Sequence, residues 1–189
     1  LFLPSILFVV AKENPHPAKY PHKLPALFQL ILLYHLEREN IDGLTMQEIA
    51  EKLKTSYATV NRCVRWMKEK GFITLNGGKE KQISFNFKGK NLWTVALPFM
   101  ETPIEFVVYT PELAISENSL ISEQNALAEY SLLNGGPYRI AISKEEYKKL
   151  KQKNIYWDPF GEAGIEVWKY DPTLLSDTGV VDKLSLYLL

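Results

Sequence analysis

The sequence predicts an α+β protein built of two modules, and three observations support this expectation. Residues 26–70 show the periodicity and capping signals of helices, whereas residues 72–87 alternate apolar and polar side chains as a β-hairpin does. Beyond residue 103, segments with strand and helix patterns interleave, which is typical of a small mixed domain. Residues 45–90 carry 10 basic and 4 acidic side chains, whereas residues 91–189 carry 8 and 14.

The overall composition places the chain among ordinary globular proteins. Its 189 residues hold 22 basic and 22 acidic side chains, with 46% hydrophobic and 23% charged residues. These values argue against disorder, a collagen-like repeat or a disulfide scaffold. A single cysteine cannot form an intramolecular disulfide, so a cytoplasmic location is the default expectation.

The first 24 residues begin with an apolar run, Leu1–Val10, that Pro4 interrupts. Ten residues are too few to span a bilayer, and the basic stretch that opens a signal peptide is missing. We therefore expect no membrane partner and interpret residues 1–24 as an apolar segment at the end of a truncated region.

Three helices are expected next. The first covers residues 26–39 after Pro25 and is apolar almost all round, so either a subunit interface or a neighbouring domain should cover its second side. Thr45 and Glu48 form a capping box that opens the second helix. Ser56 caps a third helix over residues 57–70, and Gly71 ends it.

A β-hairpin follows at once, with strands over residues 72–75 and 82–87 and a turn at residues 76–78. The segments 44–50, 56–62 and 67–73 resemble, in this order, the first helix, the recognition helix and the helix-to-wing junction of MarR-like winged helix-turn-helix regulators. The resemblance covers residues 25–90 and implies a DNA-binding domain.

The third helix has two expected faces. Val60, Val64 and Met67 recur on one side and should hold the core, with Cys63 and Phe72 nearby. Asn61 and Arg62 are the expected base readers, because these side chains can bond bidentately to adenine and guanine in the major groove. The candidate DNA-binding residues are Ser56, Tyr57, Ala58, Thr59, Asn61, Arg62, Arg65, Lys68, Lys79 and Lys81.

The other candidates are expected to position the protein on phosphates rather than to read bases. Ser56 and Thr59 lie at a helix N-terminus, which favours an anion. The alternative for Ser56 is a purely capping role, and for the lysines a solvated surface. We favour solvation for Lys88 and Lys90.

The acidic remainder is expected to comprise a linker over residues 91–103 and an α+β domain over residues 104–189. Its predicted helix over residues 122–133 should turn Ala126, Leu127, Tyr130 and Leu133 inward. A capping box of Ser143 and Glu146 should open a second helix that ends near residue 153. The expected strands cover residues 104–110, 138–142, 155–157 and 165–170.

Residues 122–130 and 166–168 weakly resemble the C-terminal region of AbiEi-type antitoxins, although Ser122 stands where a glycine is often expected. This resemblance implies a repressor of its own operon whose protein partner is a nucleotidyltransferase-like toxin.

Enzyme motifs are missing, so we expect no catalytic residues, cofactor or metal. Gly135-Gly136 lacks the Gly-Lys-Ser/Thr element of a phosphate-binding loop, and residues 158–161 lack the companion motifs of a kinase. His16, His22 and His35 form no zinc pattern with Cys63. A redox-sensing role for Cys63 is an alternative, but its position near the core face favours a buried thiol.

The sequence therefore predicts a sequence-specific regulator of transcription that binds double-stranded DNA, most simply a repressor. A homodimer is expected from the apolar helix over residues 26–39 and from Leu184, Leu186, Leu188 and Leu189. The acidic domain should bind a protein partner or a small effector. The alternative function is an adaptor whose winged helix never contacts nucleic acid.

Overall fold

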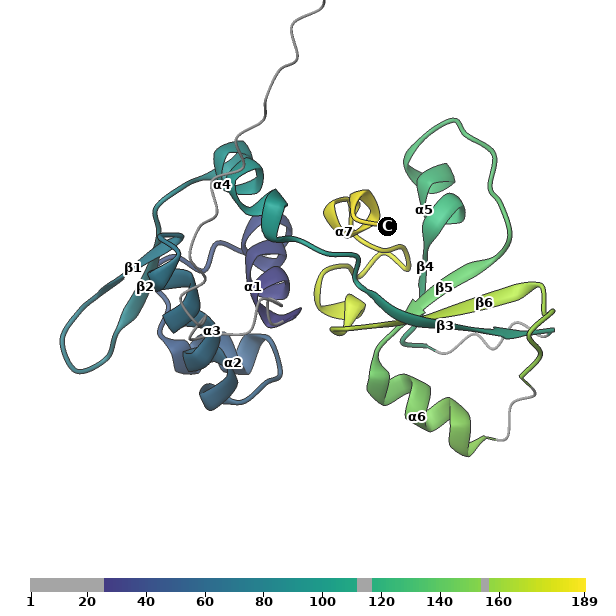
Figure 1. The fold of residues 1–189 in the computed structure, drawn as a ribbon, viewed down its shortest axis with the longest axis horizontal. Helices are drawn as coiled ribbons and strands as arrows, with labels where there is room; N and C mark the ends of the chain where they lie inside the picture. Colours follow the sequence, from purple (N-terminus) through teal and green to yellow (C-terminus); the bar gives the residue numbers. More distant parts are fainter. Residues whose placement is uncertain (1–25, 112–116, 154–156) are drawn as a thin grey trace, which may run out of the picture.

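The computed structural model describes residues 26–111, 117–153 and 157–189. It confirms the α+β fold class, with helices, a two-stranded sheet and a four-stranded mixed sheet. Figure 1 shows a winged-helix part (residues 26–96) on the left and a second part (residues 104–189) on the right, with α7 between them.

Helix α1 (Ala26–Glu37) lies between the two parts (Figure 1). The six consecutive residues from Phe28 to Leu33 are all buried, so no side of this segment faces water. Helix α3 packs against α1 from the winged-helix part, and α7 contacts it from the second part. Of the two expected coverings, the chain therefore uses its own second part.

Helices α2 (Met46–Lys52) and α3 (Tyr57–Glu69) begin where their caps predict. The Thr45 N–H donates to Glu48 Oε2 at 2.7 Å, and the Glu48 N–H donates to Thr45 Oγ1 at 3.3 Å, which completes the capping box. Ser56 Oγ accepts the Thr59 N–H at 3.2 Å. Gly71 follows α3 with φ +76°, a conformation that glycine adopts without strain.

Strands β1 (Ile73–Asn76) and β2 (Gln82–Phe85) form the expected antiparallel hairpin, which projects from the winged-helix part (Figure 1). Its base is tied to the segment before α2, where the Gly43 N–H donates to the Ile83 carbonyl at 2.8 Å. The Asp42 carboxylate accepts the Phe85 N–H at 2.7 Å. The hairpin therefore has a fixed root and an exposed tip.

Residues 91–103, expected as a linker, contain ordered helix instead. Helix α4 (Gly89–Ala96) and the 3-10 turn η1 (Leu97–Phe99) occupy this stretch, and the expected boundary at residue 90 falls inside α4. Pro98 and Pro103 suggested an irregular connection, but Pro98 lies in the first turn of η1, where proline is tolerated. Leu92 and Ala96 are fully buried, so packing stabilises α4.

The second part is a mixed sheet with strand order β3-β6-β5-β4. Its strands are β3 (Ile104–Thr110), β4 (Leu120–Ile121), β5 (Arg139–Ile142) and β6 (Ala163–Trp168). Helix α6 (Lys144–Gln152) connects the parallel pair β5 and β6. Figure 1 shows α6 on one face of the sheet and α5 (Glu123–Tyr130) on the other.

The two faces of this sheet belong to different cores. Ile140, Ile142, Ile165 and Val167 form a small cluster with Leu150 of α6. Ala141 and Trp168 point the opposite way and join the large core that contains α1, α5, the turn η2 (Pro172–Leu174) and α7 (Lys183–Tyr187). The alternation of strand side chains therefore joins the second part to the winged-helix part through one continuous core.

A buried set of hydrogen bonds also crosses between the parts. Gln29 of α1 is 6% exposed, and its Nε2 donates to the Glu101 carbonyl at 3.0 Å and to the Tyr170 hydroxyl at 3.2 Å. Its Oε1 accepts the Glu101 N–H at 3.1 Å. The Tyr170 hydroxyl lies 3.1 Å from Ser185 Oγ, so α1, the connection and α7 share one polar network.

Helix α5 corrects the expected inward face. Ala126 is buried, but Leu127, Tyr130 and Leu133 are 41%, 39% and 60% exposed. The helix ends at Tyr130, so Leu133 lies beyond it and does not continue the periodic pattern. Since the Tyr130 hydroxyl donates to the Val181 carbonyl at 2.8 Å, this side chain lies along the surface towards α7.

Other expectations for the second part hold only in part. Strand β6 begins and ends two residues before the expected range of 165–170, and β4, η2 and α7 were not anticipated. The expected strand over residues 155–157 lies mostly outside the described residues. Ser143 Oγ accepts the Glu146 N–H at 3.1 Å, as one half of the expected box requires, and the Glu146 carboxylate accepts a bond from Lys149 at 3.0 Å.

Glu166 is a buried carboxyl group at the centre of the second part. Its Oε2 accepts bonds from Ser122 Oγ at 2.7 Å and from Trp168 Nε1 at 3.0 Å. Oε1 has no hydrogen-bond partner among the described residues. Burial, with the nearby Glu123 carboxylate, raises the pKa of Glu166 to about 7, against the partial compensation of those two hydrogen bonds.

The raised pKa of Glu166 gives stability a pH dependence. Between pH 4.5 and about 7 the folded carboxyl keeps a proton that the unfolded chain has released, so the free energy of unfolding falls as pH rises. Glu166→Gln removes this titrating group. As pH rises from 4.5 to about 7, the free energy of unfolding of the wild type should therefore fall by on the order of 1 to 3 kcal/mol relative to that of the variant. Urea denaturation at several pH values measures the difference, with Glu129→Gln on the exposed side of α5 as control. Parallel pH profiles for wild type and Glu166→Gln would contradict the assignment.

Candidate nucleic-acid interface

Helix α3 separates the expected core residues from the expected DNA-binding residues. Val60, Cys63, Val64 and Met67 are 0–1% exposed, as predicted. Trp66, which the periodicity did not single out, is also buried and packs against Phe28 with ring centroids 4.9 Å apart. These contacts fix the rotation of α3 about its axis and leave its opposite side facing solvent.

The N-terminal end of α3 presents polar groups beside an aromatic side chain. Ser56, Tyr57 and Ala58 are exposed, with Tyr57 at 46%. Thr59 is only half-exposed, and its hydroxyl lies 2.8 Å from Ser56 Oγ. Thr59 also lines a cleft of about 290 Å³ that residues of the second part share.

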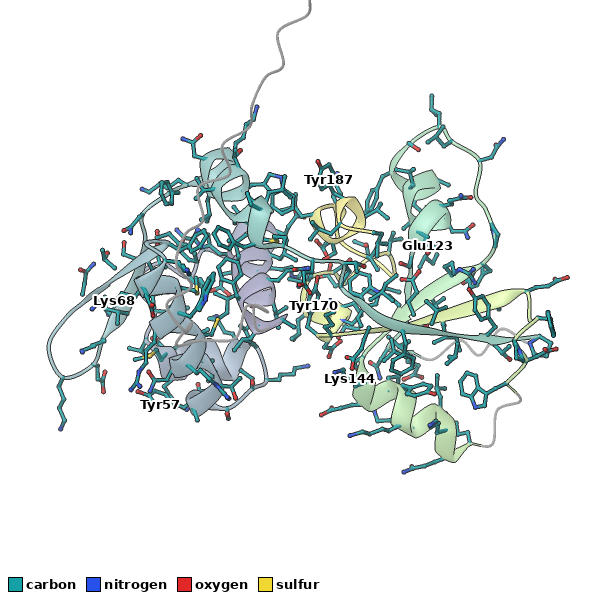
Figure 2. All side chains as sticks on the ribbon, viewed as in Figure 1. Tyr57, Lys68, Glu123, Lys144, Tyr170 and Tyr187 are labelled. Carbon is teal, nitrogen blue, oxygen red and sulfur yellow. The ribbon has the colours of Figure 1, made fainter. Side chains whose placement is uncertain are left out.

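The basic candidates on α3 stand free of acidic partners. Arg62, Arg65 and Lys68 are exposed, and none forms an ion pair with any residue that the structure describes. Asn61 lies among them and is half-buried. Figure 2 shows Tyr57 on the lower side of the winged-helix part and Lys68 on its outer side, towards the hairpin.

The hairpin adds two more free cations. Lys79 and Lys81 flank its tip, are exposed and form no ion pair within the described ranges. Elsewhere, cations are neutralised more often: Arg38 binds Asp177 at 3.2 Å, and Lys169 binds Glu101 at 3.2 Å. The positive charge of α3 and of the hairpin is therefore not balanced locally. It makes the electrostatic potential positive on the surface formed by these two elements.

Lys88 and Lys90 have positions that the hairpin pattern did not indicate. Lys88 is the N-cap residue of α4, and Lys90 lies in the first turn of that helix. Both side chains are exposed. Lys54 was also overlooked, although it is exposed in the turn before α3 and has φ +48°. Its place in the tight turn between two helices was the signal that could have found it.

Cys63 has no features of a redox sensor. Its side chain is buried on the core face of α3, and burial raises the pKa of the thiol to about 12. A reactive cysteine needs an exposed thiolate, so the structure supports the inert alternative.

His35 is half-buried, beside strand β2 of the hairpin. Its ring stacks on Phe85 with centroids 4.1 Å apart, and Nδ1 accepts the Ile41 N–H at 3.2 Å. Burial lowers the pKa of His35, although the Asp42 carboxylate opposes this shift. His16 and His22 lie outside the described residues.

Within the described ranges, no group of three His, Cys, Asp or Glu side chains could hold a metal ion. No helix in those ranges is long and apolar enough to cross a membrane.

Comparison with protein families identifies the part of the chain that carries this surface. Residues 42–74 match the family described as winged helix-turn-helix DNA-binding, a range that contains α2, α3 and the start of β1. These residues form a winged helix-turn-helix domain. The match supports a DNA-binding regulator of transcription in general and fits a non-enzymatic protein. No curated protein and no solved structure gives a significant match.

The environment of Cys63 leads to a chemical prediction. A thiol-specific reagent such as dithionitrobenzoate should react with the native protein at least 100-fold more slowly than with the protein in guanidinium, because the reagent needs an exposed thiolate. Absorbance at neutral pH follows the reaction, and Cys63→Ala provides the background. Rapid labelling of the native wild type would restore the redox hypothesis.

Proposed function

We propose that this protein is a sequence-specific repressor of transcription that binds double-stranded DNA through its winged helix. The observation that carries the proposal is the exposed face of α3, where Arg62, Arg65 and Lys68 project without ion-pair partners among the described residues. In helix-turn-helix proteins this helix enters the major groove, and phosphates supply the missing negative charge.

The proposed roles of the side chains follow from their chemistry and position. Arg62 and Asn61 are the base readers, because they lie in the first half of α3 and can bond bidentately to bases. Tyr57 and Ala58 are the apolar contacts at its start. Ser56, Arg65, Lys68, Lys79 and Lys81 are assigned to phosphates and sugars, which fix the register without reading sequence. Thr59 has a weaker claim, because it faces the cleft.

Two variants distinguish base reading from phosphate binding. Arg62→Ala should weaken binding to promoter DNA by about 1 to 3 kcal/mol and reduce the preference over a scrambled duplex. Lys68→Ala should weaken binding to both duplexes equally. It should also make the slope of log affinity against log salt concentration less steep by about one. Fluorescence anisotropy with DNA from the protein's own promoter, at several salt concentrations, measures both effects.

The same titration tests the alternative adaptor function. Specific binding that falls by orders of magnitude between low and moderate salt supports the repressor, since counterion release dominates such complexes. Equal and feeble binding of wild type to both duplexes would overturn it and favour a winged helix that only contacts proteins.

The second part is proposed to hold a protein partner. Support comes from exposed apolar side chains where α5 meets α7, namely Leu127, Tyr130, Tyr187 and Leu189. They line a groove of about 490 Å³ together with Glu123 and Lys183. Large exposed apolar patches of this kind commonly mark interaction sites.

The antitoxin-like form of the proposal assigns a nucleotidyltransferase-like toxin as this partner. Its support is the resemblance of residues 122–130 and 166–168 to AbiEi-type antitoxins. These two segments meet in space, since Ser122 Oγ and Trp168 Nε1 both donate to the Glu166 carboxylate. Co-expression with the product of the adjacent gene, followed by co-purification, tests this form separately from DNA binding.

A homodimer on a two-fold operator completes the proposal, but α1 no longer motivates it, because the second part covers that helix. Leu184 and Leu186 also pack against the chain's own core. The exposed apolar side chains of the groove between α5 and α7 support a second copy there as an occupant alternative to the protein partner.

Light scattering coupled to size-exclusion chromatography at micromolar concentration should give a mass near twice 21.7 kDa. Leu127→Glu should return the protein to monomer if the dimer uses the groove, because burying a charge without a partner is unfavourable. A monomeric wild type would contradict the dimer while leaving DNA binding untouched.

A further inference from the structure

The basic residues of the acidic second part are concentrated in one helix. Residues 91–189 contain 8 lysines and arginines, and five of them lie between residues 144 and 153. This stretch is α6 and its C-cap, Lys153. The other three, Arg139, Lys169 and Lys183, are dispersed among 12 acidic residues outside that stretch. Helix α6 is therefore a basic island on an acidic module.

Part of this charge is already neutralised. Lys144 pairs with Glu105, and Lys149 pairs with the buried Glu146 at 3.0 Å. Lys148, Lys151 and Lys153 are exposed and have no ion pair within the described residues.

The spacing of these lysines places several of them on the same side of α6. Positions 144, 148 and 151 follow the i, i+4, i+7 pattern, so these side chains lie along one face. The Lys151 ammonium lies 5.1 Å from the centre of the Tyr147 ring. Unlike an ion pair with a carboxylate, this contact does not neutralise the positive charge. Glu145 is the exposed carboxylate of this helix and lies in its first turn.

The N-terminal end of α6 lies close to the start of the recognition helix, and the free lysines follow further along α6. One cleft is lined by Lys54, Thr55 and Thr59 from the winged-helix part and by Ser143 and Lys144 from the second part. Figure 2 shows Tyr57 and Lys144 on the same lower side of the molecule, and Figure 1 shows α6 on that side, below the sheet and running outward from the winged-helix part.

We propose that α6 is a second DNA-contacting element, whose Lys148, Lys151 and Lys153 bind the phosphate backbone of the same duplex that α3 enters. This inference rests on the proposed function, because it needs the winged helix on DNA. A duplex on the N-terminal end of α3 has the hairpin on one side and α6 on the other, so the lysines of α6 meet backbone beyond the site that α3 reads. These lysines would bind phosphates through their positive charge. They would not read bases, because contacts to the backbone carry no sequence information.

A membrane surface is a different occupant of a basic helix, but the surroundings of α6 disfavour it. The module around α6 is acidic, and Glu105 and Glu145 lie at the same end of the helix. In contrast, DNA bound to the neighbouring winged helix would be a polyanion on the same side of the molecule as α6. The cluster therefore has the charge and position of an auxiliary phosphate contact.

The salt dependence of binding tests this proposal on the full chain. Lys148→Gln/Lys151→Gln should make the slope of log affinity against log salt less steep by about two, since each phosphate contact contributes about 0.9. Affinity for promoter and scrambled duplexes should fall by the same factor, so sequence preference stays unchanged. Lys88→Gln/Lys90→Gln, on α4, is the control that removes the same charge from two exposed lysines outside α6 and should leave the slope unchanged. Circular dichroism confirms that each variant is folded.

Each outcome separates this proposal from the proposed function. If Arg62→Ala reduces promoter preference but the α6 variant keeps the wild-type slope, DNA binding stands and the role of α6 is overturned. If the α6 variant and Lys88→Gln/Lys90→Gln reduce the slope equally, the effect is one of net charge and the local contact is also overturned. Binding of anionic vesicles by the wild type, lost in the α6 variant while DNA binding persists, would replace DNA with a membrane. A wild type that binds no duplex overturns both proposals.

Discussion

The structure depends on the burial of α1 from both sides. A helix with six consecutive buried residues cannot lie on a surface, so the chain must supply a second layer over it. The sheet, η2 and α7 provide that layer, and Gln29 finds partners in the connection and in Tyr170. Because a buried amide without partners is costly, these bonds favour this one arrangement of the two parts.

This shared core places charges as well as apolar groups. The formal net charge of zero is composed of a basic winged helix and an acidic second part. Local ion pairs neutralise several cations of the second part, whereas Arg62, Arg65 and Lys68 find no acidic partner among the described residues. Charge left unneutralised in a folded protein is free to attract a polyanion, and here it lies on the helix that the fold exposes.

Local signals predicted the winged-helix part well, because its elements begin and end with short-range chemistry. The Thr45–Glu48 box, the Ser56 cap and Gly71 each act within four residues, and all three appear as expected. The second part was harder to predict because its packing is long-range. Leu127 is exposed although α5 contacts α7, and α4 is helical because Leu92 and Ala96 fit the core. Among the candidate site residues, Thr59 lines a cleft that includes residues more than 80 positions away, and no local pattern could indicate this contact.

The continuous core also limits how the second part can influence DNA binding. A hinge between the parts would have to expose α1 and break the bonds of Gln29, at a cost comparable to a large fraction of ordinary domain stability. A partner seated on α5 and α7 is therefore expected to act without such opening. It can change DNA affinity through the charge that it adds to the complex. Regulation of this kind needs no second conformation, because the rigid junction already fixes where a bound partner stands relative to the DNA.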